Sequence, residues 1–255
     1  MKSTKPPTSS VEGPMSGRWC GFSRAAAALV LGLLAAQAVA DDKPATPAET
    51  AQASNSKDDG QKWISLFDGK TLDGWKVSKF GGEGPVTVED GRILLGFGSD
   101  LTGIHTDRKL PKINYEVDVE AMRVDGSDFF CGLTFPVKDD PCSLIIGGWG
   151  GGVCGLSSLD RLDASENETT TYREFKKGQW YKVRLRVMEN RIQAWLDDKE
   201  IVDVDTTGRR LSIRYEVEPS RPFGFASWQT TAALRNIRIR ELSEEELKAA
   251  AKMQE

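Results

Sequence analysis

Apolar and polar residues alternate with a period of two along most of the chain between residues 62 and 242. Such alternation is typical of β-strands that bury one face, and no 3.6-residue periodicity competes with it here. About a dozen short strands separated by Gly- and Asp-rich turns predict an all-β fold, an antiparallel β-sandwich or barrel. The alternation is clean over residues 115–121, 181–187, 191–196, 199–204 and 234–240, and weaker over 86–88, 92–95, 101–105, 129–135, 143–146, 153–159 and 224–227.

The two ends of the chain differ from this body. Residues 41–60 contain no large apolar residue, which predicts a disordered linker. Ser243 and Glu246 have the spacing of a capping box, so residues 243–255 are predicted to form a short C-terminal helix. We therefore expect one folded domain over residues 61–242.

Residues 1–40 have the features of a secretory signal peptide. The uncharged run from Ala25 to Ala40 follows Arg18 and Arg24 and ends in a small-x-small cleavage site. It is too short and Ala-rich for a good membrane span, although an uncleaved anchor is the alternative. A start at Met15 instead of Met1 would give a leader of ordinary length. The sequence predicts a secreted or periplasmic protein with no membrane span after cleavage.

Charge and composition exclude several classes of function. With 34 Lys+Arg against 38 Asp+Glu, the net charge of −4 gives no basic footprint for nucleic acid. A single histidine, His105, excludes multi-histidine metal centres, so a metal site would need mainly oxygen ligands. No βαβ rhythm appears that would favour a nucleotide-binding fold. The oligomeric state does not follow from the sequence.

Three cysteines follow the leader: Cys131, Cys142 and Cys154. An exported compartment permits disulfides, and an odd number allows at most one bridge within the chain. Buried thiols or one staple is the favoured interpretation, and a catalytic pair with His105 is the alternative.

The strand pattern also predicts a charge ladder on one face of a sheet. Strand 115–121 directs Glu116, Asp118 and Glu120 away from the core, whereas the strands 181–187 and 234–240 direct Lys and Arg side chains away. If these strands are neighbours, acidic and basic rows lie side by side. A solvated outer face with matched charges is the favoured interpretation, and an anion-binding surface is the alternative.

Three phrases carry a family resemblance over roughly residues 62–242. They are Leu66-Phe-Asp-Gly-Lys-Thr-Leu-Asp-Gly-Trp75, Lys177-Gly-Gln-Trp-Tyr181 and Leu234-Arg-Asn-Ile-Arg-Ile239. The chain resembles the 3-keto-disaccharide hydrolase domain family, whose fold is a concanavalin-like, laminin-G-like jelly roll. The resemblance implies such a jelly roll and activity on 3-keto-glycosides. In the phrases themselves, Asp68-Gly69 predicts a tight turn, and Trp75 and Trp180 are expected in the core.

The chain departs from the family pattern in the middle. Family members carry an Asn-Ser-Gly phrase on one strand, and an acidic residue and Gln on the next. Here the two strands read Asp128-Phe-Phe-Cys-Gly-Leu-Thr134 and Cys142-Ser-Leu-Ile-Ile-Gly-Gly-Trp149, with apolar residues at the usual polar places.

Polar residues are densest between residues 157 and 171. Glycoside cleavage usually needs two carboxylates, and elimination at a 3-keto sugar needs a base. Asp160, Glu166 and Glu168 are the predicted acid/base residues or ligands of a divalent cation such as Ca²⁺, and Asn167 is a predicted sugar-binding residue. A solvated polar loop is the alternative interpretation.

Aromatic residues near glycines suggest sugar-stacking platforms. Trp149 lies between glycines, and Trp228 precedes a polar run. The alternative is that Trp149 plugs the end of the sandwich. His105 is a further substrate-binding candidate, although a lone histidine is more often structural. Arg214, Tyr215 and Glu216 precede Pro219 and fit one end of a cleft.

Two functions from different classes follow, together with a third. The leading hypothesis is a hydrolase acting on 3-keto-glycosides or disaccharides, with a carbohydrate substrate as its partner. The second is a non-catalytic, lectin-like module that binds a glycan. The third is a structural or partner-binding surface sandwich.

Overall fold

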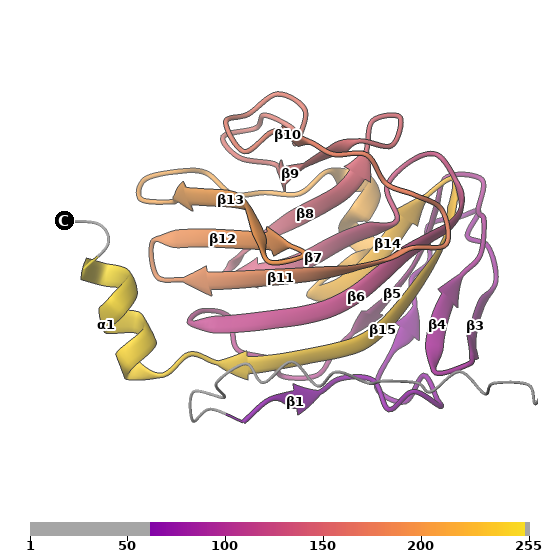
Figure 1. Cartoon of the computed structure of the whole chain (residues 1–255), viewed down its shortest axis with the longest axis horizontal. Coiled ribbons are helices and arrows are strands. Elements are labelled where there is room, and N and C mark those ends of the chain that lie inside the picture. The colour runs from indigo at the N-terminus through magenta and orange to yellow at the C-terminus, as the bar shows by residue number, and fades with distance from the viewer. Residues whose placement is uncertain (1–61, 253–255) are drawn as a thin grey trace, which may run out of the picture. The chain divides into compact units, whose positions relative to one another are not determined.

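The computed structural model describes residues 62–252 of the chain. The predicted signal peptide (1–40), the linker (41–60) and the alternative start at Met15 lie outside the described residues. The described part is mostly antiparallel β-structure in two sheets, followed by a short helix (Figure 1). This confirms the predicted antiparallel β-sandwich.

The first sheet, called the ladder sheet below, has the strand order β13-β12-β11-β6-β15-β4-β3, with β1 beside β15. Its longest strands, β6 and β15, lie side by side at its centre (Figure 1). The strands are β1 (Ile64–Ser65), β3 (Val86–Glu89), β4 (Arg92–Leu95), β6 (Tyr115–Gly126), β11 (Trp180–Met188), β12 (Arg191–Leu196), β13 (Lys199–Asp205) and β15 (Thr230–Glu241).

The second sheet, called the pocket sheet below, has the strand order β10-β9-β8-β7-β14-β5-β2. A 3₁₀ helix, η1 (Tyr215–Ser220), contacts β14 and β5 of this sheet. The strands are β2 (Lys76–Val77), β5 (Leu101–Thr106), β7 (Cys131–Val137), β8 (Asp140–Gly148), β9 (Val153–Ser157), β10 (Thr171–Tyr172) and β14 (Phe223–Trp228).

The core lies between the two sheets and is filled by alternate residues of the strands. Tyr115, Phe130 and Phe225 are among the largest side chains that are completely buried there. Trp75 packs against Phe225 and donates a hydrogen bond from its indole nitrogen to the carbonyl of Leu66 at 2.7 Å. An indole that is buried with its N–H satisfied is a stable core anchor, as expected from the opening phrase.

The three cysteines of the described chain are free thiols buried in this core. Burial raises the pKa of Cys131 and of Cys142 to about 12, and that of Cys154 to about 11. His105 is out of their reach, because it follows the buried Ile104 on β5 and so points to the opposite face of the sheet. The thiols therefore stay protonated at neutral pH and form neither a staple nor a Cys–His pair.

The predicted charge ladder is present on the outer face of the ladder sheet, but its centre is buried and not solvated: Glu116 is 2% and Asp118 6% exposed. Glu116 lies between Arg186 and Arg240 in register, with nitrogen–oxygen distances of 2.7 and 3.4 Å. Asp118 pairs with Arg238 at 2.6 Å, and Glu120 pairs with Arg235 at 2.7 Å. Each acidic side chain thus has a basic partner on a neighbouring strand.

Trp180 belongs to this outer face, which corrects the expectation that it is a core anchor. It is half-buried, and the guanidinium of Arg235 lies over its ring at 4.1 Å from the centroid. The next residue, Tyr181, takes the core position instead. Trp180 and Tyr181 are successive residues of β11, so their side chains lie on opposite faces of the strand.

The C-terminal helix α1 (Glu244–Lys252) begins with the predicted capping box. The backbone N–H of Glu246 donates to the Ser243 hydroxyl at 3.2 Å, and the Glu246 carboxylate accepts from the backbone N–H of Ser243 at 2.9 Å. Glu246 also pairs with Arg240 at 2.6 Å, which ties the helix to the ladder sheet. Within residues 62–252, no helix has the length and apolar character needed to cross a membrane.

Candidate functional site

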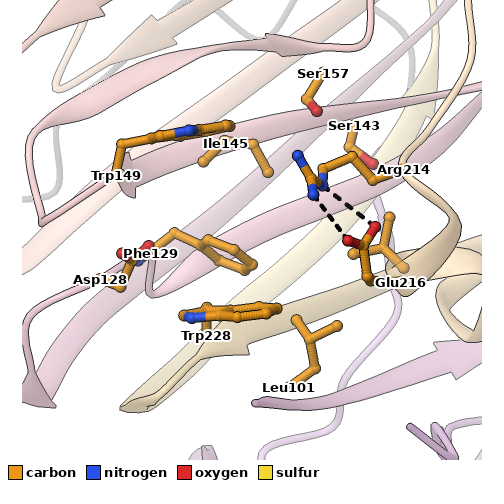
Figure 2. Close-up of a pocket in the computed structure, with 11 residues that line it drawn as sticks. Leu101, Asp128, Phe129, Ser143, Ile145, Trp149, Ser157, Arg214, Glu216 and Trp228 are labelled. Carbon is orange, nitrogen blue, oxygen red and sulfur yellow. Dashed lines mark hydrogen bonds and ion pairs between the residues drawn. The ribbon is translucent and has the colours of Figure 1, made fainter. Parts of the chain in front are cut away.

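A pocket of about 230 Å³ lies on the face of the pocket sheet that is turned away from the core. Its residues come from β5, β8, β9, β14, η1 and the segments before β7 and after β8, so distant parts of the sequence meet there (Figure 2). The volume is near the lower end of small-molecule sites, which begin at about 300 Å³, and suits a ligand about as large as one sugar ring. The lining residues are Leu101, Asp128, Phe129, Ser143, Ile145, Trp149, Ser157, Arg214, Glu216, Val217 and Trp228.

The pocket has an apolar wall of aromatic and aliphatic side chains. In Figure 2 the indoles of Trp149 and Trp228 flank Ile145 and Phe129. Trp149 is 43% exposed, so a large part of its side chain is accessible to a ligand. Flat aromatic surfaces of this kind pack well against the apolar faces of sugar rings.

Local backbone geometry explains how Trp149 comes to be exposed. Trp149 has a positive φ of 48°, and Gly147 and Gly150 on either side of it also have positive φ angles. This is the left-handed conformation that glycine adopts without strain and that turns the chain sharply after β8. The turn lifts the indole away from the sheet and over the pocket.

Asp128 holds this turn in place. One of its carboxylate oxygens accepts a hydrogen bond from the backbone N–H of Phe129 at 2.7 Å, and the other accepts from that of Gly150 at 3.1 Å. The carboxylate therefore connects the segment before β7 with the residue that follows Trp149. Its oxygens serve the backbone, so Asp128 positions the aromatic wall of the pocket.

Arg214 and Glu216 form the charged part of the pocket. The Arg214 guanidinium donates two hydrogen bonds to the Glu216 carboxylate, at 2.8 and 3.3 Å (Figure 2). It also pairs with the buried Asp163. Hydrogen bonding from Arg214 lowers the pKa of Glu216, and the two carboxylates raise the pKa of Arg214. The pocket thus presents an ionised carboxylate and a guanidinium, which accept from and donate to sugar hydroxyls.

Two serine hydroxyls lie beside this charged pair in Figure 2. The hydroxyl of Ser143 on β8 is hydrogen-bonded to that of Thr134 on β7 at 2.9 Å. The Ser157 hydroxyl on β9 donates to Asp163. The middle strands therefore carry small hydroxyl groups and Ile145 on this face.

The structure places the predicted acidic residues of the 157–171 loop outside the pocket. Asp160 and Glu168 both pair with Arg209, and the Arg209–Glu168 distance is 2.6 Å. Hydrogen bonds lower the pKa of both carboxyls, from the backbone of Arg210 for Asp160 and from the Arg209 side chain for Glu168. This arrangement keeps both groups ionised and matched by one guanidinium.

The other two predicted residues of the loop have different positions. Glu166 is exposed, and within residues 62–252 its carboxylate accepts a single hydrogen bond, from the backbone N–H of Asp163 at 3.4 Å. Asn167 is buried, and its amide bonds the carbonyls of Leu156, Leu162 and Asp163 as well as the N–H and hydroxyl of Thr169. Asn167 therefore organises the loop from within.

His105 also lies apart from the pocket. It is half-buried on β5, and its Nδ1 atom is 2.9 Å from the hydroxyl of Ser78. For the predicted divalent cation, the described residues contain no group of three or more His, Cys, Asp or Glu side chains that is arranged to hold a metal ion. The oxygens of Asp160 and Glu168 are directed at Arg209 instead.

The structure therefore brings together two of the residues singled out in the sequence, Trp149 and Trp228. It adds Arg214 and Glu216, whose place before Pro219 already fitted the end of a cleft. Asp128 was not found from the sequence, because a single aspartate before an apolar strand gives no distinguishing signal. Roles for the remaining candidates in substrate binding or catalysis stay predictions.

Comparison with known proteins identifies a family and a fold. The sequence pattern of the 3-keto-α-glucoside-1,2-lyase-like domain matches residues 62–240. No curated protein gives a significant match. A putative glycosyl hydrolase from Parabacteroides distasonis is 16% identical, with 71% of this chain and 94% of that chain covered and a TM-score of 0.47.

Two further solved structures share the fold with a TM-score of 0.50. One is a Crh5 transglycosylase in complex with NAG, 12% identical, with 72% of this chain and 84% of that chain covered. The other is a non-specific endo-β-1,3(4)-glucanase of family GH16, 9% identical, with 72% and 95% covered. At these identities the likeness concerns the fold alone.

Proposed function

Because the chain belongs to the family of 3-keto-α-glucoside-1,2-lyase-like domains, we propose that it is an exported protein that binds one ring of a glycoside in the pocket. The 3-keto-glycosides are the ligand class that the family suggests. The leader-like residues 25–40 support export.

The main support for this proposal is that the pocket combines an aromatic wall with two charged side chains. Trp149 and Trp228 offer flat surfaces to the C–H face of a sugar ring, while Arg214 and Glu216 offer a donor and an acceptor to its hydroxyls. Sugar sites need both, because a sugar ring has apolar faces and a polar rim. The enclosed volume of about 230 Å³ favours recognition of one ring, at the end or side of a longer glycan.

Calorimetric titration with trehalose, 3-keto-trehalose and a set of neutral oligosaccharides tests this function. Saturable binding of at least one of them is expected, and Trp149→Ala should weaken it. Trp195→Ala is the matched control, since that indole lies on the ladder sheet beneath the Arg184 guanidinium, 4.5 Å from its centroid. Equal losses for the two variants, or no binding at all, would argue against the pocket.

The second candidate function is cleavage of a bound 3-keto-glycoside. Two observations favour it: the family match and the presence of an ionised carboxylate beside a guanidinium in the pocket. A ketone at C3 acidifies the hydrogen at C2, so a carboxylate base can take this proton and leave the charge on the ketone oxygen as an enolate. Glu216 is the carboxylate suited to this role, and Arg214 is the donor suited to the enolate oxygen.

The remaining steps balance without an oxidant. The enolate returns its electron pair to form the C1–C2 double bond as the bond from C1 to the aglycone oxygen breaks. The departing oxygen takes up a proton, and addition of water across the double bond then completes a net hydrolysis. The lowered pKa of Glu216 keeps it ionised near neutrality but makes it a weaker base, so Arg214 has to supply much of the stabilisation.

Incubation with 3-keto-trehalose, followed by chromatography of the released glucose, tests cleavage. Parallel samples with EDTA and with added Ca²⁺ show whether a metal takes part. Glu216→Gln should abolish release, whereas Glu168→Gln, its control in the acidic loop, should retain it. Binding without release in every sample would leave the non-catalytic glycan-binding function standing alone.

A further inference from the structure

A second cavity adjoins the pocket, because two chain segments contribute neighbouring residues to both. Asp128 and Trp149 line the pocket, and their neighbours Ser127 and Gly150 line this second cavity, called the basic groove below. Its volume of about 720 Å³ is large enough for further sugar units. The groove is lined by Arg123, Gly126, Ser127, Gly150, Gly151, Gly152, Arg173, Glu174, Phe175, Lys176, Lys177, Gln179 and Tyr181.

Arg123 on β6 is the central charged group of the groove. Its side chain is only 5% exposed, and it donates hydrogen bonds to the carbonyls of Asp128, Gly147 and Gly151 at 3.2, 3.0 and 2.9 Å. The guanidinium also lies 5.1 Å from the ring centroid of Phe130. The carbonyls satisfy several donors but carry no full negative charge.

No carboxylate among residues 62–252 forms an ion pair with Arg123, which distinguishes it from most arginines of the ladder sheet. Burial lowers the pKa of Arg123, and the charge of the nearby Asp128 carboxylate offsets only part of this effect. Its Nη1 atom makes no hydrogen bond within the described chain, yet it is not among the fully buried atoms that lack a partner. Nη1 therefore opens into the groove that Arg123 lines.

A glycine keeps the approach to this atom clear. Gly151 has a φ of +112°, and a Cβ at that position would lie 2.7 Å from the carbonyl oxygen of Ser127 and 3.5 Å from Nη1 of Arg123. A side chain there would both clash and cover the guanidinium. Gly151 thus leaves the free edge of Arg123 accessible beside the turn that carries Trp149.

A buried cation that forms no ion pair is costly in a protein, and an anionic ligand lowers that cost. We propose that the basic groove binds the carboxylate or sulfate group of an acidic sugar, with Nη1 of Arg123 as its principal donor. Nε and Nη2 are already used by the carbonyls, but Nη1 still has N–H groups to donate, and a hydrogen bond between two ionised groups is stronger than one between neutral groups. This proposal rests on the proposed function in one respect, since the acidic sugar is taken to be part of a glycan whose other ring occupies the pocket.

The other charges of the groove support an anion near Arg123. Lys176 is exposed and has no ion pair within the described chain, so its ammonium is available to the same ligand. Arg173 and Lys177 already pair with Asp197 and Asp125 at 2.6 Å and contribute less. Glu174 is the one carboxylate among the lining residues, and it favours a ligand with a single anionic group over a polyanion.

The groove itself is tested with simple probes that do not depend on the pocket. Glucuronate, inorganic sulfate and glucose are titrated separately while the NMR signals of the Arg123 guanidinium are followed. Saturable shifts with glucuronate, sulfate or both, but not with glucose, are expected, and they should persist in a Trp228→Ala variant. Absence of shifts with both anions, or equal shifts with glucose, would overturn the proposal.

The acidic-glycan assignment is tested by calorimetry with neutral, uronate-bearing and sulfated oligosaccharides of equal length. An acidic oligosaccharide should bind at least about fivefold more tightly than the neutral one at low salt, and the preference should shrink at 1 M NaCl. Lys176→Glu should remove most of the preference, whereas Lys70→Glu, an exposed lysine outside the groove without an ion pair in the described chain, should not.

A second variant guards against misfolding, since Arg123 holds the Trp149 turn. Lys176→Gln removes the ammonium but leaves Arg123 and the turn unchanged, so it should reduce the acidic preference while leaving neutral binding intact. If no oligosaccharide binds but glucuronate or sulfate still shifts Arg123, the pocket function fails and the anion site stands. If neutral and acidic oligosaccharides bind equally and Lys176→Glu changes nothing, the proposal is overturned.

Discussion

The acidic loop at residues 157–171 and the pocket beside it both contain carboxylates, but they use them differently. In the loop, Asp160 and Glu168 both pair with Arg209, and the Asn167 amide forms hydrogen bonds with backbone carbonyls and with Thr169. In the pocket, the Arg214–Glu216 pair stands open beside two indoles. Arg214 is matched by two carboxylates just as Arg209 is, so the two regions differ in position and not in charge matching: the Arg214–Glu216 pair lines a cavity beside apolar surfaces.

The largest effect that separates the two regions is expected from Asn167→Ala. The variant leaves buried backbone carbonyls without their amide donor, which should lower the free energy of unfolding by about 2–4 kcal/mol. Glu166→Ala in the same loop is exposed and should stay within about 0.5 kcal/mol of wild type. Urea unfolding of both variants measures this. If Asn167→Ala proved as stable as Glu166→Ala, the loop would not be held together by its amide.

The next effect concerns the aromatic wall. Trp149→Ala and Trp228→Ala should each weaken sugar binding by about tenfold, equivalent to roughly 1.4 kcal/mol, because each removes a stacking surface. Trp149 is 43% exposed, so its removal should change stability little. Calorimetry gives the affinities and thermal unfolding gives the stability. Unchanged affinity in both variants would move the ligand away from this pocket.

A smaller effect is expected in the loop itself from the double variant Asp160→Asn, Glu168→Gln. Both groups are exposed, so the loss of their pairing with Arg209 should change the stability of the protein very little. Sugar affinity and any release of glucose from 3-keto-trehalose should match wild type. If the double variant folded but no longer released glucose from 3-keto-trehalose, the loop carboxylates would be the catalytic residues after all.

The smallest effect is a change of pH profile. Hydrogen bonding from Arg214 lowers the pKa of Glu216 below its usual value of 4.5, so the ionised form is favoured in the folded state. Its stabilising contribution is therefore present above pH 4.5 and is lost as the pH falls through the lowered pKa. Arg214→Ala should move the acid limb of sugar binding upward towards pH 4.5. An acid limb at the same pH in both proteins would show that Arg214 does not set this titration.

The period-two pattern allowed most of the fold to be predicted. Strands β4 and β12 begin and end where the alternation does, and the charge ladder follows from the same pattern. Strands β1, β2 and β10 were missed because two residues cannot display a period. Trp180 was misplaced because its large ring suggested burial, while Arg235 supplies a cover for it on the outer face.

The candidate site was only partly predictable for a different reason. Trp149 and Trp228 stand out locally, since large aromatic residues beside glycine or polar runs are uncommon. Asp160 and Arg209 form an ion pair although they are 49 positions apart in the sequence, and Asp163 and Arg214 form another across 51 positions. No local pattern shows which carboxylate will meet which guanidinium across such separations. Only the folded chain shows which of the two arginine clusters lines a cavity.

Intermolecular NOEs between a bound sugar and the protein test the central claim most directly. With trehalose and 3-keto-trehalose as probes, ring protons of the sugar should give contacts to the indole protons of Trp149 and Trp228. No contacts are expected to the side chains of Asp160 or Glu168. A sugar that contacts the acidic loop or the ladder sheet, and neither indole, would contradict the assignment of the pocket.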